Sequence, residues 1–308
     1  VTLPCINRST EDYELGDPGK FEIASLHTMP RIAYAAVHVV ADPVENNNPS
    51  IDAAIDWEAT INYRRYVWSL GLGVAEAMDT AQRGMGVNWE NSLELVKRSV
   101  DAARDFQIEN GGALLACGAG TDHLEPSPNI SVDDVINAYE EQCHAIESAG
   151  GRIILMASRA LAMAASSPDD YLKVYERILS QVKEPVIIHW LGEMFDPALK
   201  GYWGSDDHWT GMETCLKVIA GKAEKVDGIK ISLLDSKKEI AMRNKLPAGV
   251  RMYTGDDFNF PELIAGDDTG YSDALLGIFD AIAPAASAAL GAMGRQDMEE
   301  YNNILSPT

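Results

Sequence analysis

Cysteine and long apolar runs are scarce in this chain of 308 residues. Its four cysteines lie far apart, no two of them form a CxxC pair and no secretory leader precedes them, so we expect a reduced, cytoplasmic location. No apolar run approaches the ~20 residues that a membrane-spanning helix needs. Membrane functions are therefore poor candidates.

Positive charge is scarce as well, because 25 basic residues stand against 47 acidic ones and the net charge is −22. A field of that sign repels nucleic acid and anionic membranes, which makes both poor partners. An anionic substrate would have to be met by a local cluster of basic residues. The content of 46% hydrophobic and 23% charged residues is typical of a globular protein. We therefore expect a folded protein whose partner is a small molecule.

Apolar strand-like segments alternate with helical segments eight times along the chain, with no antiparallel hairpin signal between them. The strand-like segments are 31–40, 73–79, 113–120, 152–158, 184–190, 228–232, 249–257 and 272–278. The helices are expected at 57–69, about 90–106, 131–148, 169–181, 211–223, 236–244, 261–265 and 281–293. Strict alternation predicts a parallel sheet with helices outside, and eight units match a single-domain (β/α)8 TIM barrel. An open doubly wound sheet is less favoured, because no glycine-rich phosphate loop follows the first strand.

This fold divides the chain into three parts. We expect residues 1–30 to form an N-terminal arm or lid and residues 31–297 to form the barrel. Residues 298–308 would begin a C-terminal helical extension that is cut short at the last residue.

Lys230 stands at the centre of the short apolar strand in the segment KVDGIKISLLD. Ile229 and Ile231 flank it and point to the opposite face of a strand. Both faces of a parallel sheet are covered, so Lys230 would be desolvated, which lowers the pKa of its amine from ~10.4. A neutral amine can attack a carbonyl group and form a Schiff base. The alternative is a charged lysine whose side chain extends to the end of the strand.

Polar residues are frequent where the expected strands end, which is where the chemistry of a barrel is found. They are His38, Asp79, Arg83, Asp122, His123, Ser158, Arg159, His189, Glu193, Lys230, Asp256 and Asp257. Arg83 and Arg159 lie just beyond strand ends and could clamp a carboxylate or phosphate. His189 closes the apolar strand PVIIH, where a hydrogen-bonded core histidine is the alternative to a catalytic one.

Several of these segments resemble a known superfamily. Asp227–Ser232 with Asp235, Pro185–His189, Tyr253–Asp257 and Asp280–Pro284 follow the order and spacing of the dihydrodipicolinate synthase and N-acetylneuraminate lyase superfamily. Within it, the chain resembles most closely an uncharacterised branch known as a domain of unknown function. The runs that carry this resemblance across residues 31–307 include GLGVAEAMDTAQRGMG, ACGAGTD, ILMASRAL, HWLGEMFDPALKGYWGS, DGIKISLLD and YTGDDFN.

The resemblance implies that Lys230 takes the place of the lysine that forms a Schiff base with a 2-oxo acid. The turn that holds the carboxylate of that acid corresponds to Asp79–Arg83, in which Thr80 is the one threonine kept. His189 replaces the proton-relaying tyrosine, and it can do the same work if its pKa is near neutral. Arg159 and Ala160 replace a tyrosine pair, so the resemblance implies a carbonyl substrate other than pyruvate, such as a sugar-derived oxo acid or keto-sugar.

Three functions remain open at this stage. The leading one is a class I lyase or aldolase in which Lys230 forms the imine and no metal or other cofactor is needed. The expected catalytic residues are Lys230, His189, Thr80 and Tyr253, and the expected substrate-binding residues are Arg83, Arg159, Asp79, Asp256, Glu193 and His38.

The second function is a metal-dependent sugar isomerase or epimerase, and the third is a barrel that binds a metabolite without catalysis. In the second, the metal ligands would be His38, Asp79, His189, Glu193 and Asp256. The superfamily resemblance implies a homo-oligomer in each case.

Overall fold

The fold is a closed barrel of eight parallel strands, seen in a computed structural model that describes residues 1–14, 20–48 and 53–308. The strands follow each other around the barrel in chain order, and the last one, β10, closes it against the first, β3. They are β3 (Ala33–Ala36), β4 (Gly73–Glu76), β5 (Leu115–Ala119), β6 (Arg152–Leu155), β7 (Val186–Leu191), β8 (Val226–Ser232), β9 (Arg251–Thr254) and β10 (Asp273–Leu276). The expected (β/α)8 barrel, a single domain, is confirmed.

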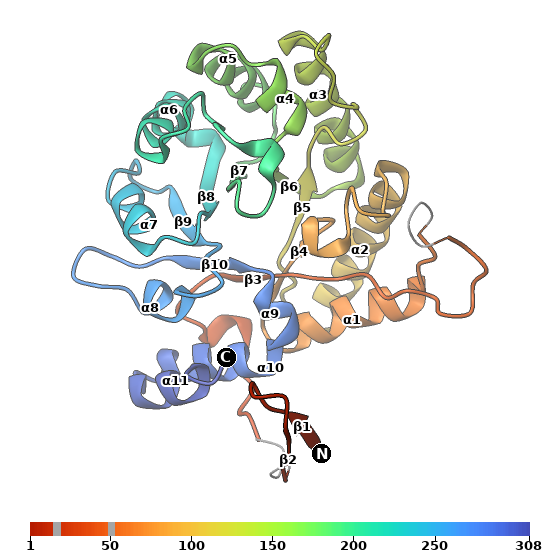
Figure 1. Ribbon diagram of the computed structural model, residues 1–308, viewed down its shortest axis with the longest axis vertical. Coiled ribbons are helices and arrows are strands. Elements are labelled where there is room, and N and C mark those ends of the chain that lie inside the picture. Colours follow the sequence, from red (N-terminus) through yellow and green to blue (C-terminus); the bar gives the residue numbers. More distant parts are fainter. Residues whose placement is uncertain (15–19, 49–52) are drawn as a thin grey trace.

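Helices form a ring outside these strands (Figure 1). They are α1 (Trp57–Ser69), α2 (Trp89–Asn110), α3 (Val132–Ala149), α4 (Arg159–Ala164), α5 (Pro168–Leu179), α6 (His208–Gly221), α7 (Ser236–Arg243), α8 (Phe260–Ala265), α9 (Ile278–Ala281) and α10 (Ala283–Gly294). Their starts follow capping chemistry: the Asp56 carboxylate accepts the Ala59 N–H before α1, and Ser131 and Asp134 cap α3 reciprocally. The short helices α4 and α9 were not expected.

The apolar residues form two layers, one inside the barrel and one between the strands and the helices. Tyr34, Ile154, Ile187 and Tyr253 belong to the inner layer. Residues that alternate with them, such as Ile188, pack outward against the helices. Inward and outward positions alternate along each strand, as the period of a strand requires.

One irregularity interrupts this alternation, between β7 and β8. Val186 pairs with Val226, but the next residue, Ile187, pairs with Gly228, so β8 carries one extra residue at Asp227. Beyond this shift His189 pairs with Lys230. Such a bulge re-aims the side chains that follow it.

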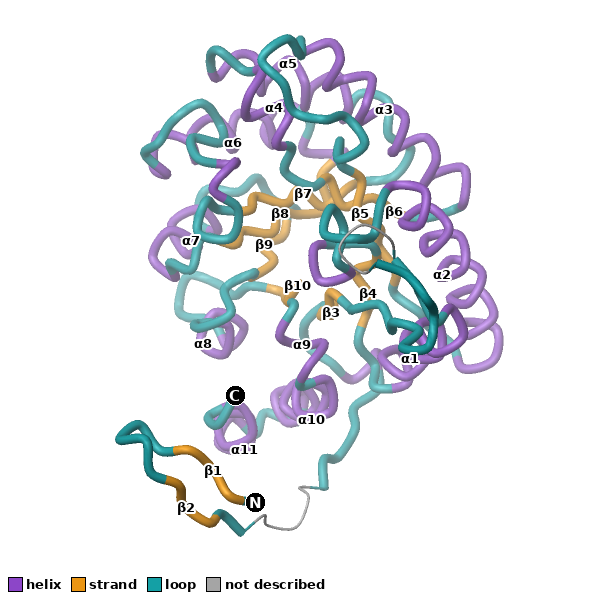
Figure 2. Tube along the Cα trace, turned by 45° about the vertical axis from the view of Figure 1, so that its right-hand side comes forward, coloured by secondary structure: helices purple, strands orange, loops and turns teal. Residues whose placement is uncertain are grey.

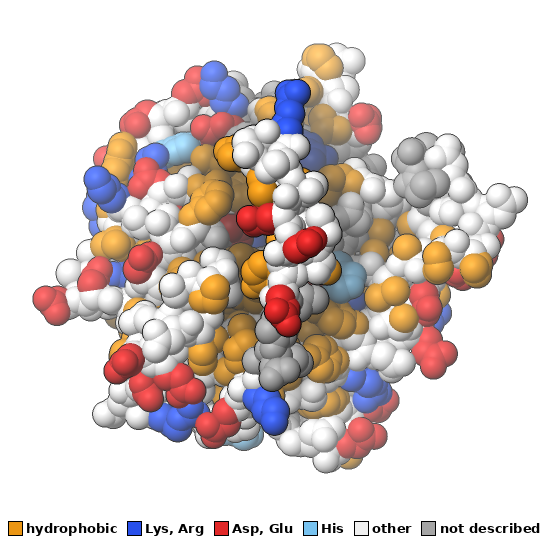
Figure 3. All heavy atoms as spheres, turned by 60° about the horizontal axis from the view of Figure 1, so that its bottom comes forward, with side chains coloured by type: hydrophobic (Ala, Val, Ile, Leu, Met, Phe, Trp, Pro, Cys, Tyr) orange, Lys and Arg blue, Asp and Glu red, His pale blue; other side chains and the backbone are white. Residues whose placement is uncertain are grey.

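The two ends of the chain lie outside the barrel. Residues 1–14 form a hairpin of β1 (Thr2–Pro4) and β2 (Thr10–Asp12), which projects away from the barrel strands near α11 (Figure 2). Apolar side chains lie on both sides of this projecting segment (Figure 3). The arm is therefore partly regular, although residues 15–19 of it lie outside the described residues.

Residues 20–30 and the C-terminus are attached to the same side of the barrel. The Ala24 N–H donates to Ser287 Oγ of α10 at 3.1 Å. Helix α11 (Met298–Leu305) packs on α10 with Tyr301 and Leu305 buried, and Tyr301 Oη donates to the carbonyl of Pro261. Residues 298–305 thus form the expected helix.

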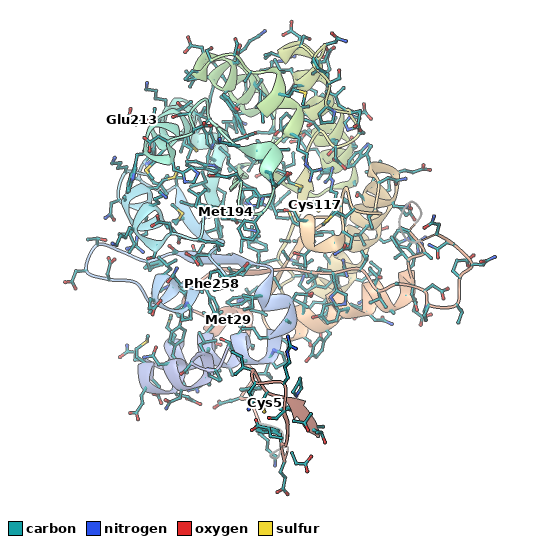
Figure 4. All side chains as sticks on the ribbon, in the orientation of Figure 1. Cys5, Met29, Cys117, Met194, Glu213 and Phe258 are labelled. Carbon is teal, nitrogen blue, oxygen red and sulfur yellow. The ribbon has the colours of Figure 1, made fainter. Side chains whose placement is uncertain are left out.

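All four cysteines are free thiols. Cys5 lies in the hairpin, whereas Cys117 lies among the barrel strands (Figure 4). In the part of the chain that the structure describes, no helix combines the length and apolar character needed to cross a bilayer.

Candidate active site

Lys230 lies in β8 with its side chain inside the barrel and only 7% of the residue exposed. Its neighbours Ile229 and Ile231 pack outward against the helices, as the alternation predicted. Its amine forms no hydrogen bond or ion pair with residues 1–14, 20–48 or 53–308. Burial lowers the pKa of this amine, while the charges of Asp79 and Asp257 oppose that shift without cancelling it.

Gly255 makes room for this side chain. A Cβ atom at position 255 would lie 2.7 Å from Lys230 Cε and 2.3 Å from Ser232 Oγ. The backbone N–H of Gly255 meanwhile donates to the carbonyl of Ile231, so the end of β9 is held against β8. The glycine of the YTGDD segment is therefore a steric requirement of the lysine.

Two carboxyl groups, those of Asp79 and Asp257, influence the pKa of the Lys230 amine through their charge. Asp79 begins a 3₁₀ turn after β4, and Asp257 follows β9; both are half-buried. Burial raises the pKa of each carboxyl group, and the positive charge of Lys230 partly offsets this. A lysine with a lowered pKa thus lies near two acids with raised pKa values, a pattern that is frequent at functional sites.

His189 faces the same space, because it is the β7 residue paired with Lys230. Its ring is buried, its Nε2 lies 3.3 Å from Ser232 Oγ, and its Nδ1 has no hydrogen-bond partner among the described residues. Burial and the charge of Lys230 lower the pKa of His189 well below 6.5. The sequence-based expectation of a pKa near neutral is therefore wrong, and the resting imidazole is neutral.

A cavity of about 290 Å³ opens beside His189, over the ends of β4 to β7. Asp79 and His189 line it, whereas Lys230 lies behind them and is not part of the lining. The other polar side chains that line it are Arg83, Thr121, Asp122, Glu125, Ser158, Arg159 and Asp196. The volume suits a small ligand.

Arg83 is buried in the wall of the cavity, and all five of its N–H donors face protein acceptors. Nε and Nη2 bind the two carboxylate oxygens of Asp122 at 3.1 and 2.6 Å, and Nη2 also donates to Gln142 Oε1. Nη1 donates to the backbone carbonyls of Ala77 and Gly118. Arg83 was expected to clamp a substrate anion, but its donors are used within the fold.

Arg159 differs from Arg83, because its side chain is 49% exposed at the edge of the cavity. Its Nε donates to Asp196 Oδ2, which follows β7. Within the described ranges, its two Nη groups form no hydrogen bond to protein. Arg159 is therefore the cavity arginine with free donors, although its charge is paired.

Tyr253 and Thr80 were both expected to relay protons, but neither side chain lines the cavity. Tyr253 points into the barrel, but its hydroxyl donates to Asp227 at 2.6 Å, at the start of β8, and its ring lies against Gly228. It therefore faces the opposite end of the barrel from the cavity. Thr80 is half-buried beside Gly277 after β10, and it does not line the cavity.

Three further expected residues are engaged elsewhere. His38 Nδ1 lies 2.7 Å from Asp280, and Glu193 accepts from His208 Nε2 at 2.9 Å. Asp256 accepts three hydrogen bonds within its own loop. None of the three lines the cavity, and no cluster of three or more metal-binding side chains occurs among the described residues. The ligand set suggested for an isomerase is therefore not assembled.

Sequence reasoning noted Asp257 and Ser158 at strand ends but gave them no role in the site, and it did not name Thr121. Asp257 faces Lys230, where Asp256 had been chosen, and Ser158 and Thr121 share a buried hydrogen bond of 2.6 Å in the cavity wall. The signal for Asp257 was its place in the YTGDD segment. For Ser158 the signal was its position at the end of the expected fourth strand.

Solved structures share this architecture. Dihydrodipicolinate synthase from Aquifex aeolicus has a TM-score of 0.63 and 11% identity, covering 89% of this chain and 78% of that one. The synthase from Acinetobacter baumannii, complexed with pyruvate, has a TM-score of 0.64 and 15% identity, covering 89% and 79%. The 2-keto 3-deoxygluconate aldolase from Picrophilus torridus has a TM-score of 0.58 and 16% identity, covering 91% and 86%. At these identities the likeness establishes the fold.

A comparison with curated proteins finds no match. The family model described as "Protein of unknown function (DUF993)" matches residues 1–308. The chain, a barrel with the fold of dihydrodipicolinate synthase and a lysine buried on β8, thus belongs to the DUF993 family.

Proposed function

We propose that the protein is a class I lyase or aldolase in which Lys230 forms an imine with the carbonyl group of a small oxo compound. The observation that carries the proposal is the amine of Lys230: it is buried inside the barrel, unpaired among the described residues and lowered in pKa beside two carboxyl groups. The fold likeness to two Schiff-base lyases supports the same general chemistry.

Imine formation would begin with the neutral amine. Lys230 Nζ attacks the carbonyl carbon, a C–N bond forms, and the carbonyl oxygen becomes a hydroxyl group that leaves as water. That oxygen must gain protons and the amine must lose them. Asp79 suits this exchange, because it lines the cavity, lies near the amine and has a raised pKa.

Bond cleavage would then use the iminium group as an electron sink. A base removes the proton of a hydroxyl group in the substrate, the adjacent C–C bond breaks to release a carbonyl fragment, and its electron pair forms an enamine on Lys230. Protonation of the enamine and hydrolysis by water release the second fragment and restore the amine. We assign the proton transfers to Asp79, with neutral His189 relaying through its unpartnered Nδ1.

The test is reductive trapping with cyanoborohydride and a panel of oxo acids and ketoses. We expect a mass increase on the peptide that contains Lys230, equal to the probe less the carbonyl oxygen, and none in Lys230→Ala. Lys200→Ala is the matched control, because Lys200 is an exposed lysine on the loop after β7. Labelling that is unchanged in Lys230→Ala, or absent with every probe, contradicts the proposal.

A further inference from the structure

The charges around the cavity carry information about the substrate. Asp79, Asp122, Glu125 and Asp196 supply four carboxylates, and Arg83 and Arg159 supply two guanidinium groups. The formal charge of the lining is therefore −2, or −1 when Asp79 is protonated, and the neutral pKa-lowered His189 adds nothing. Lys230 and Asp257 are not part of the lining, and the neutral amine that imine formation requires adds no positive charge to it.

Neither arginine offers the cavity an unopposed positive charge. The guanidinium of Arg83 binds Asp122 through two parallel hydrogen bonds and has no donor left. Arg159 keeps its Nη donors, but Asp196 binds its Nε and sits in the cavity wall. A phosphate group carries a charge of about −1.5 to −2 at pH 7, so it would enter a space that is already negative.

The hydrogen-bonding groups of the lining favour a different ligand. A carboxylate only accepts, and phosphate oxygens also accept, so the two do not complement each other. A hydroxyl group donates as well as accepts, and it fits Asp79, Glu125, Ser158 and Thr121 together. The Nη donors of Arg159 can bind a hydroxyl or carbonyl oxygen without needing an anion.

We propose, on the basis of the imine-forming function proposed above, that the substrate is an uncharged polyhydroxylated carbonyl compound, a ketose or aldose without a phosphate group. This differs from the anion clamp that the two arginines suggested in the sequence. Arg83 organises the wall with Asp122, and Arg159 binds neutral oxygen atoms at the edge of the cavity.

The experiment compares dihydroxyacetone with dihydroxyacetone phosphate at equal concentration, by the initial rate at which cyanoborohydride labels Lys230. Rates with free Nα-acetyl-lysine correct for the intrinsic reactivity of each probe. We expect the corrected rate to be at least about tenfold higher for the neutral probe, because the negative lining opposes the phosphate. Equal rates, or faster labelling by the phosphate, would overturn the inference and leave the imine function standing.

Two variants sharpen the comparison by removing a negative charge from the lining. Asp196→Asn also frees the charge of Arg159, and Glu125→Gln changes an exposed residue at the edge, where folding is not at risk. In both variants, the corrected labelling rate with dihydroxyacetone phosphate, divided by that with dihydroxyacetone, should rise several-fold. Asp206→Asn is the control, because it makes the same charge change on an exposed loop residue outside the cavity. If the control moves the ratio as much as they do, the inference fails, and if no probe labels Lys230 in any protein, the proposed function fails with it.

Discussion

Burial and two neighbouring carboxylates set the pKa of the Lys230 amine. Burial lowers its pKa, and the carboxylates of Asp79 and Asp257 act in the opposite direction. Its labelling rate with a neutral ketose should therefore reach half of its maximum at a lower pH than that of free Nα-acetyl-lysine, which is not buried. Asp79→Asn should move the midpoint lower still, because the charge that stabilises the ammonium form is lost. Mass spectrometry of the Lys230 peptide and of Nα-acetyl-lysine across a pH series measures this, and a common midpoint for the two amines would contradict it.

His189 has a different role from the amine, and its removal should separate trapping from turnover. His189→Ala should still be labelled on Lys230, while turnover falls by roughly 10²–10⁴-fold, the usual share of an acid–base group. Because the pKa of His189 lies well below 6.5, its protonation should contribute no change in rate between pH 6.5 and 8. His144→Ala, an exposed change on α3, is the control. Normal turnover in His189→Ala would mean that histidine only fills space.

At the scale of elements, Glu239 joins α7 to β9 and to the residue that precedes β10. Its carboxylate accepts from Thr254 Oγ1 at 3.0 Å and from Ser272 Oγ at 2.7 Å, and it is buried. Burial raises the pKa of Glu239 to about 7 from 4.5. The folded protein therefore holds a proton over that window which the unfolded chain has released.

This group should make stability depend on pH. Its contribution is fully present below about pH 4.5 and is lost as the pH rises through about 7, which amounts to on the order of 3 kcal/mol. Glu239→Gln should lack that loss, so the wild type should weaken relative to the variant between pH 5 and 8. Urea unfolding at a series of pH values measures the difference. A constant difference would show that Glu239 stays ionised in the folded state.

The helices and strands themselves followed from local patterns. The expected helices 57–69 and 131–148 match α1 and α3, which begin after the capping residues Asp56 and Ser131. Strand ends were predicted less well: the segment 31–40 holds only the four residues of β3, because pairing with both neighbours ends where the chain turns into the loop. Local sequence does not encode where a neighbouring strand stops.

On the scale of the whole molecule, the eight alternating units were enough to predict the barrel, and the flanking isoleucines indicated a desolvated Lys230. The hydrogen-bond partners of each polar residue could not be predicted from the sequence. Arg83 meets Asp122 and Gln142, which are 39 and 59 residues away, so its lack of free donors depends on the assembled fold. Tyr253 was expected to relay protons, but packing on Gly228 directs its side chain towards the other end of the barrel.

The extra residue in β8 has a consequence for how this strand can change. Val226 packs outward, and in an uninterrupted strand residue 230 would share its face, since the two are an even number of positions apart. The shift at Asp227 reverses the alternation of faces along β8. Even-numbered residues point outward before the shift and inward after it. Inserting or deleting one residue between 226 and 230 would therefore restore uninterrupted alternation and turn the amine of Lys230 towards the helices. The inward direction of the Lys230 amine therefore depends on the number of residues between Val226 and Lys230.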